Sequence, residues 1–126
     1  MAKLIEMDEK ATLKDQMENE AAGPVVLINK FNVDSDEVEQ FLEAWKEDAT
    51  KFKDQSGFIS AQLHKGIGKS RVFVNYAVWE SLDHFKNAVD NVIGPDFQSQ
   101  LSKYPKSLVV SPHLFKKVAV QGICLD

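Results

Sequence analysis

Amide and indole side chains interrupt one apolar run of this chain. The run "RVFVNYAVW", residues 71–79, is typical of a buried strand, yet its centre is Asn75. Strand side chains alternate between two faces, so Asn75 and Trp79 share a face. An amide buried without a partner is costly, so we expect a backbone group, a water or a ligand beside Asn75.

A second apolar run, "PVVLINKF" at residues 24–31, carries Asn29 in the same kind of setting. Two interpretations of these amides remain open. In one, each amide satisfies a neighbouring bulge or loop, and Trp79 is simply part of the core. In the other, Asn29, Asn75 and Trp79 line a pocket, where the indole adds an N–H donor on a flat apolar ring suited to an aromatic ligand.

Four further residues are weaker candidates for the wall of such a pocket. Phe73 shares its strand face with the central asparagine, and Phe85 points inward on the next predicted helix. His64 would serve as a general base if its strand face met the pocket, and His84 would approach the pocket if its helix were rotated. The histidines are scattered without metal-ligand spacing, so we predict no metal site.

The elements that must position these residues follow from hydrophobic periodicity. Residues 33–57 predict a long amphipathic helix capped by Asp34 or Ser35, and a hairpin joins residues 58–68 to the asparagine strand. The remaining segments are a helix at 80–94, a short helix opening at Pro95, and a β-rich tail at 107–126. The order strand, helix, strand, strand, helix, strand predicts an α+β, ferredoxin-like split βαβ fold, in which helices pack on one face of an antiparallel sheet.

That arrangement leaves the other face of the sheet bare. The strands carry too many apolar residues on both faces for one face to meet only water. We therefore expect a homodimer in which two sheets meet face to face.

Composition and charge narrow the class of protein. A chain of 126 residues suits one compact domain, which we place at residues 24–126 after a charged N-terminal arm at residues 1–23. The arm is expected to be ordered by docking, on a second subunit or over the pocket, or to be disordered. A net charge of -4 without a basic patch disfavours nucleic acid and anionic membrane as partners. The single cysteine and the acidic start without a signal peptide favour the cytoplasm.

Several segments resemble the antibiotic biosynthesis monooxygenase (ABM) superfamily of small dimeric α+β barrels. They are "VVLINKFNV", "QSGFISAQLHKG", "VNYAVWESLDHFKNA" and "PDFQSQL", and the resemblance covers roughly residues 24–120. It implies that Asn29, Asn75 and Trp79 are the catalytic residues of a monooxygenase that oxidises a small aromatic or quinol-like compound with dioxygen. In the cofactor-free members no flavin, nicotinamide or metal takes part, so the resemblance implies no cofactor.

Two alternatives stay open beside this expectation. One is a binding or stress-related barrel that holds a small apolar molecule without turnover, because no residue is an obvious general base. The other is a haem-degrading enzyme, a related branch that places an axial histidine in the short helix. Here that helix reads Phe97, Gln98, Ser99, Gln100, Leu101, so haem would have to rely on His84.

Overall fold

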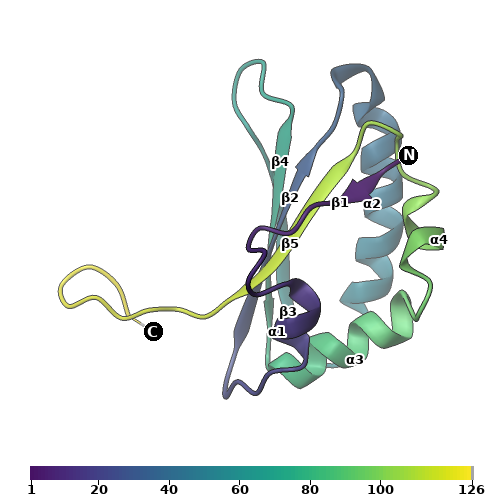
Figure 1. The fold of residues 1–126 in the computed structure, drawn as a ribbon. Helices are drawn as coiled ribbons and strands as arrows, with labels where there is room; N and C mark the ends of the chain where they lie inside the picture. The colour runs from purple at the N-terminus through teal and green to yellow at the C-terminus, as the bar shows by residue number, and fades with distance from the viewer. Residues whose placement is uncertain (126) are drawn as a thin grey trace.

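The computed structural model describes residues 1–125 (Figure 1). From β2 onward its elements follow the predicted order, whereas the strand and the helix in the arm were not predicted. The elements are β1 (Lys3–Leu4), α1 (Leu13–Met17), β2 (Val25–Asn32), a 3-10 turn (Ser35–Glu37), α2 (Val38–Lys53), β3 (Phe58–Lys65), β4 (Val72–Trp79), α3 (Leu82–Val92), α4 (Phe97–Leu101) and β5 (Val109–Phe115). The α+β, ferredoxin-like fold predicted from the sequence is therefore present.

The sheet has the strand order β1-β5-β2-β4-β3. Strands β5, β2, β4 and β3 pair antiparallel with their neighbours, whereas β1 pairs parallel with β5 at the edge. Helices α2, α3 and α4 lie on one face of this sheet (Figure 1). The register sets Asn29 of β2 directly opposite Asn75 of β4, and Pro112 of β5 lies on the other side of Asn29.

Helix boundaries differ from the sequence expectation at two caps. Asp34 makes no side-chain capping bond and instead accepts a hydrogen bond from the Arg71 guanidinium at 2.8 Å. The short helix α4 begins two residues after Pro95, because the side chain of Asp96 accepts a hydrogen bond from the Ser99 amide at 3.0 Å.

The core consists of two clusters between the sheet and the helices. In one, Phe41 of α2 is fully buried, and its ring centroid lies 4.9 Å from that of Phe31 and 5.1 Å from that of Phe73. The other surrounds Trp79 and Phe85 near the start of α3. These two clusters hold the sheet and helices apart at both ends, which leaves room for a cavity between them.

The N-terminal arm docks on its own domain. The backbone amide of Lys3 donates to the Leu108 carbonyl at 3.0 Å, which adds β1 to the sheet edge. Further along, the Gln16 side chain donates to the Leu114 carbonyl at 2.9 Å and accepts from the Leu114 amide at 3.0 Å. The arm is therefore ordered against its own domain, which agrees with the expectation that it covers the pocket and not with the expectation of disorder.

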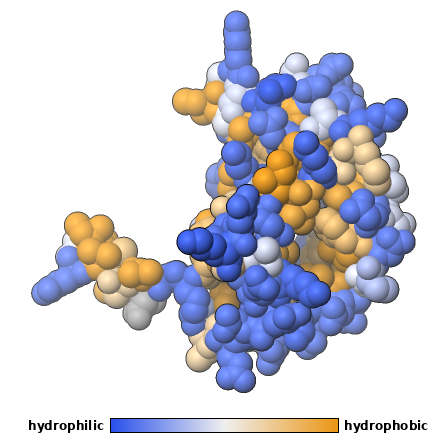
Figure 2. Space-filling model, in the orientation of Figure 1, coloured by the Kyte–Doolittle hydropathy of each residue, from blue (hydrophilic) through white to orange (hydrophobic). Residues whose placement is uncertain are grey.

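The face of the sheet that the helices leave free is partly apolar. Its half-buried or exposed residues include Ile28, Val72, Val74, Tyr76 and Val78. Beyond β5, residues 116–125 run away from the domain (Figure 1), and Figure 2 shows apolar side chains on this projecting segment. Val118, Ile123 and Leu125 are each more than two-thirds exposed there. Within residues 1–125, no helix has the length and apolar character needed to cross a bilayer.

Candidate functional site

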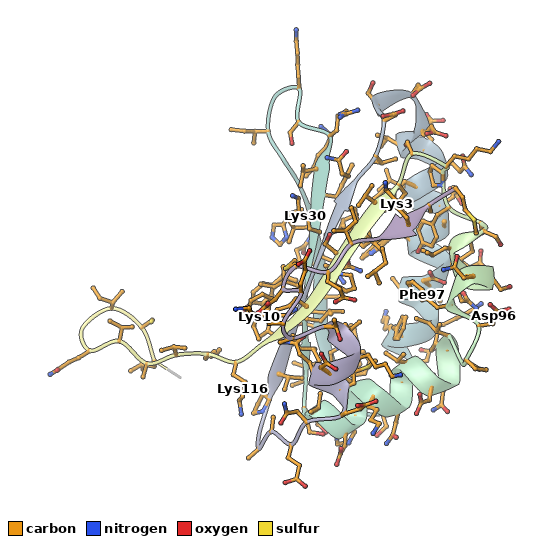
Figure 3. The ribbon with its side chains drawn as sticks, viewed as in Figure 1. Lys3, Lys10, Lys30, Asp96, Phe97 and Lys116 are labelled. Atoms are coloured by element: carbon orange, nitrogen blue, oxygen red, sulfur yellow. The ribbon has the colours of Figure 1, made fainter. Side chains whose placement is uncertain are left out.

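A cavity of about 650 Å³ lies between the sheet and the helices. This volume and a mostly apolar lining are typical of a small-molecule site. Figure 2 shows a hollow with apolar walls on this side of the molecule, and Figure 3 shows Phe97 directed inward from α4 while Asp96 lies at the outer edge. Strands β2 and β4 supply much of one wall, which we call the sheet wall. Helices α2, α3 and α4 and the loop that follows α4 supply the facing helix wall.

The sheet wall carries three polar atoms that lack partners. Asn29 and Asn75 lie side by side on paired strands, and Trp79 follows on the same face of β4. Within residues 1–125, neither amide oxygen nor the indole Nε1 has a hydrogen-bond partner, although all three atoms are buried. Buried polar groups normally find partners, so three orphans on one cavity wall indicate a place for a ligand or for water.

Aromatic packing holds the Trp79 ring in place. The rings of Phe52, Phe58 and Phe85 surround it edge to face, with centroids 6.2, 5.4 and 5.9 Å away. Trp79 is only 2 % exposed. Because neighbours from α2, β3 and α3 clamp the ring, the indole N–H keeps a fixed position on the wall without rearrangement.

The helix wall carries a polar pair that the sequence analysis missed. Asp48 of α2 accepts a hydrogen bond from the Tyr104 hydroxyl at 2.6 Å and a second from the Lys103 ammonium. The helical spacing could have indicated the position of Asp48. Asp48 follows Trp45 by three residues and precedes Phe52 by four, so all three lie on the face of α2 that lines the cavity.

Tyr104 is held as a neutral hydroxyl. Burial raises the pKa of this phenol, and the negative charge of Asp48 raises the pKa further. The side chain is 9 % exposed and packs its ring against Phe41. Its hydrogen is therefore committed to the Asp48 carboxylate, while its oxygen keeps a lone pair.

The N-terminal arm forms part of the cavity wall as well. Leu4, Leu13 and Met17 contribute apolar surface, and Glu6 and Lys14 contribute charged side chains. The carboxylate of Glu6 accepts a hydrogen bond from the Leu13 amide at 2.8 Å, which fixes the turn before α1. The arm thus covers a side of the cavity that the sheet and the other helices leave open.

Two of the four weaker candidates lie on the inner side of the sheet, but only one lines the cavity. Phe85 of α3 lines the cavity beside Trp79. Phe73 shares the face of Asn75, as expected, but packs into the aromatic cluster with Phe41 at one end of the cavity and does not line it. Phe73 does not reach the cavity because it lies two residues before Asn75 on β4, where the strand is already covered by the aromatic cluster around Phe41.

Both candidate histidines lie away from the cavity. His64 pairs with Val74, which places it on the opposite face of the sheet, where it is exposed. His84 lies at the start of α3, where its Nδ1 is 2.7 Å from the Ser81 hydroxyl and its ring fills the space beside Gly57. The period-two alternation of β3 and the capping of α3 by Ser81 fix these directions.

Comparison with known families and structures agrees with this architecture. The sequence pattern of antibiotic biosynthesis monooxygenases matches residues 24–98. None of the curated proteins matches the chain. A proposed monooxygenase from Shewanella loihica PV-4 is 28% identical, with a TM-score of 0.63, and the match covers 79% of this chain and 100% of that one.

Two further solved structures extend the comparison. SnoaB, a cofactor-independent oxygenase from Streptomyces nogalater, is 25% identical over 80% of this chain and 99% of its own, with a TM-score of 0.65. A conserved protein from Methanosarcina mazei Go1 is 11% identical over 76% of this chain and 94% of its own, with a TM-score of 0.63, which shows a shared fold alone. Because the family pattern spans more than half of the chain, this protein belongs to the antibiotic biosynthesis monooxygenase family.

Proposed function

We propose that this protein is a cofactor-independent monooxygenase that oxidises a small aromatic or quinol-like compound with dioxygen. The observation that carries the proposal is the group of unpartnered amide and indole atoms of Asn29, Asn75 and Trp79 on one wall of an apolar cavity. The likeness to SnoaB, which is described as a cofactor-independent oxygenase, supports the same reaction class.

The proposed chemistry begins with loss of a proton from an activated ring carbon of the substrate. The resulting enolate transfers an electron to dioxygen, and recombination gives a peroxide. Loss of water from that peroxide converts the ring methylene to a carbonyl, so one oxygen atom stays in the product and the other leaves as water. The indole N–H of Trp79 and the side-chain NH2 groups of Asn29 and Asn75 would hold the enolate oxygen, where fixed donors in a dry cavity stabilise developing charge. The unpartnered amide oxygens would accept hydrogen bonds from the substrate or from water.

A second candidate function is binding without turnover. It is favoured by the engagement of Asp48, since Tyr104 and Lys103 already occupy both of its carboxylate oxygens. A carboxylate held in this way is a poor general base. A protein with this cavity would then sequester an apolar molecule rather than oxidise it.

Haem degradation does not suit the donor set of the cavity. None of His64, His84 and His113 lines it, and α4 contributes Phe97, Gln100 and Leu101. We therefore assign no role to haem.

The assembly and the cellular context are also proposals. The partly apolar free face of the sheet supports a homodimer with the sheets face to face. The single cysteine, Cys124, supports a cytoplasmic location. We keep the division into an arm at residues 1–23 and a domain at residues 24–126, since the family pattern begins at residue 24.

Oxygen uptake by the purified protein tests the proposed function. The protein, prepared without added cofactor or metal, is mixed with anthrones, naphthoquinols and catechols in an oxygen-electrode cell. We expect uptake above the buffer rate for at least one of these compounds, with one oxygen atom of labelled dioxygen appearing in the product. Saturable ligand binding without any uptake would instead support the binding function.

A further inference from the structure

The two walls of the cavity differ in hydrogen-bonding character. The sheet wall presents the indole N–H donor of Trp79 and the amides of Asn29 and Asn75, each of which carries an NH2 donor and a buried carbonyl oxygen without a partner among residues 1–125. The helix wall presents the Tyr104 hydroxyl, whose hydrogen is donated to Asp48. Because that hydrogen is already used, Tyr104 meets a ligand as an acceptor.

The surroundings of Tyr104 keep it in this acceptor role. Asp48 is itself held by Lys103, which also lies 3.6 Å from Glu47, so the carboxylate is fixed between two donors. Tyr104 has little freedom to turn, since it is 9 % exposed and its ring packs on Phe41. A ligand oxygen without a hydrogen would meet only lone pairs at this position, which is unfavourable in a desolvated site.

We infer that Tyr104, oriented by Asp48, is a specificity-determining residue that selects aromatic ligands carrying a hydroxyl donor on the side facing the helix wall. Such a ligand carries a hydrogen-bond acceptor at one end and a hydroxyl donor at the other. A carbonyl or enolate oxygen faces the donors of Asn29, Asn75 and Trp79, and a hydroxyl faces the Tyr104 oxygen. This inference rests on the proposed function, because it takes the cavity as the substrate site.

Binding of two matched probes tests the inference. Anthrone and 4,5-dihydroxyanthrone differ only in their hydroxyl groups, which lie at the end of the ring system opposite the carbonyl, and anaerobic calorimetry measures their affinities without turnover. For the Tyr104→Phe variant we expect about tenfold weaker binding of dihydroxyanthrone, the loss of one good hydrogen bond, and an unchanged affinity for anthrone. Tyr76→Phe is the matched control, since Tyr76 lies on β4 and faces away from the cavity.

Changes at Asp48 test the orienting role separately. Asp48→Asn keeps an oxygen that accepts the Tyr104 hydrogen, so the preference for dihydroxyanthrone should be retained. Asp48→Ala frees that hydrogen, and the preference should fall by several-fold. Melting temperatures of all variants identify any that fail to fold.

The outcomes separate this inference from the proposed function. Equal losses for both probes in Tyr104→Phe, or no loss for either, would mean that Tyr104 only ties its loop to α2. Failure of the wild-type protein to bind dihydroxyanthrone more tightly than anthrone would also overturn the inference. A clear preference that depends on Tyr104, without oxygen uptake, would uphold the inference and reject the monooxygenase function.

Discussion

At the scale of single residues, the cavity combines orphaned polar atoms with a firmly packed aromatic frame. Asn75 is only half-buried as a residue, yet its amide oxygen is buried and lacks a partner within residues 1–125. A buried polar atom without a partner lowers the free energy of unfolding, and it leaves a hydrogen-bonding group free for a ligand. Changes of these side chains should therefore affect turnover more than folding.

Replacement of Asn75 by alanine is expected to lower kcat about a hundredfold, the usual cost of removing one donor to a developing oxyanion. The melting temperature should stay the same or rise, because the variant removes a buried polar atom without a partner. Steady-state oxygen uptake and thermal unfolding measure the two effects. Asn87→Ala is the control, since Asn87 is exposed on α3. A kcat equal to that of the control would exclude Asn75 from the chemistry.

The hydroxyl of Tyr104 should produce an alkaline loss of stability. Its pKa is raised in the folded protein above the ordinary value of 10.0, so the unfolded chain releases this proton at lower pH than the folded one. The free energy of unfolding should therefore fall as pH rises above about 10. Urea unfolding at pH 8 to 11 measures this slope, which should be shallower in Tyr104→Phe. Equal slopes in the two proteins would contradict the assignment.

At the scale of elements, the N-terminal arm extends the domain rather than lying beside it. The matches to the Shewanella and Streptomyces structures cover 79% and 80% of this chain but nearly all of those chains. The arm, which precedes the family match, adds Leu13 and Met17 to the cavity wall. Its attachment depends strongly on Gln16, whose amide makes both hydrogen bonds to Leu114.

Loosening the arm is expected to shorten ligand residence. Gln16→Ala removes two hydrogen bonds to the β5 backbone, each worth about 1 kcal/mol, so the dissociation rate of dihydroxyanthrone should rise by up to about thirtyfold. Stopped-flow displacement under nitrogen measures this rate. Gln98→Ala, an exposed glutamine of α4, is the control. An unchanged dissociation rate would mean that the arm covers the cavity without retaining the ligand.

At the scale of the whole molecule, one face of the sheet has no covering layer among residues 1–125. Helices occupy the other face, and residues 116–125 extend beyond the domain with apolar side chains exposed (Figure 1). A sheet that is apolar on both faces normally meets a second layer. A second copy of the chain would supply that layer on the free face.

Light scattering at micromolar concentration is therefore expected to give about twice the chain mass of 14.2 kDa. Val74→Glu places a charge on the free face and should shift the protein toward the monomer, because burial of an unpaired carboxylate is costly. Leu42→Glu, on the exposed side of α2, is the control and should leave the mass unchanged. A monomeric wild-type protein would exclude the face-to-face dimer.

Local periodicity was enough to predict the elements and the polar residues of one wall. The spacing of apolar residues places Asn75 and Trp79 on one strand face, and it gives the strand and helix order that defines the fold. These features repeat every two or 3.6 residues, so they are visible within a short stretch of sequence. The same reasoning left the positions of His64 and His84 open, because it could not decide which face met the cavity.

Only the tertiary structure shows the contacts between segments that are distant in the sequence. The pairing of Asn29 with Asn75 depends on the register of two strands separated by α2 and β3. The bond from Tyr104 to Asp48 joins residues 56 positions apart, and Gln16 meets Leu114 across 98 positions. No local pattern encodes such contacts, because they arise only when the apolar faces of several elements are buried against one another. The sequence by itself determined the fold and the polar residues of the sheet wall, whereas packing alone decided the bond between Tyr104 and Asp48 and the position of the arm.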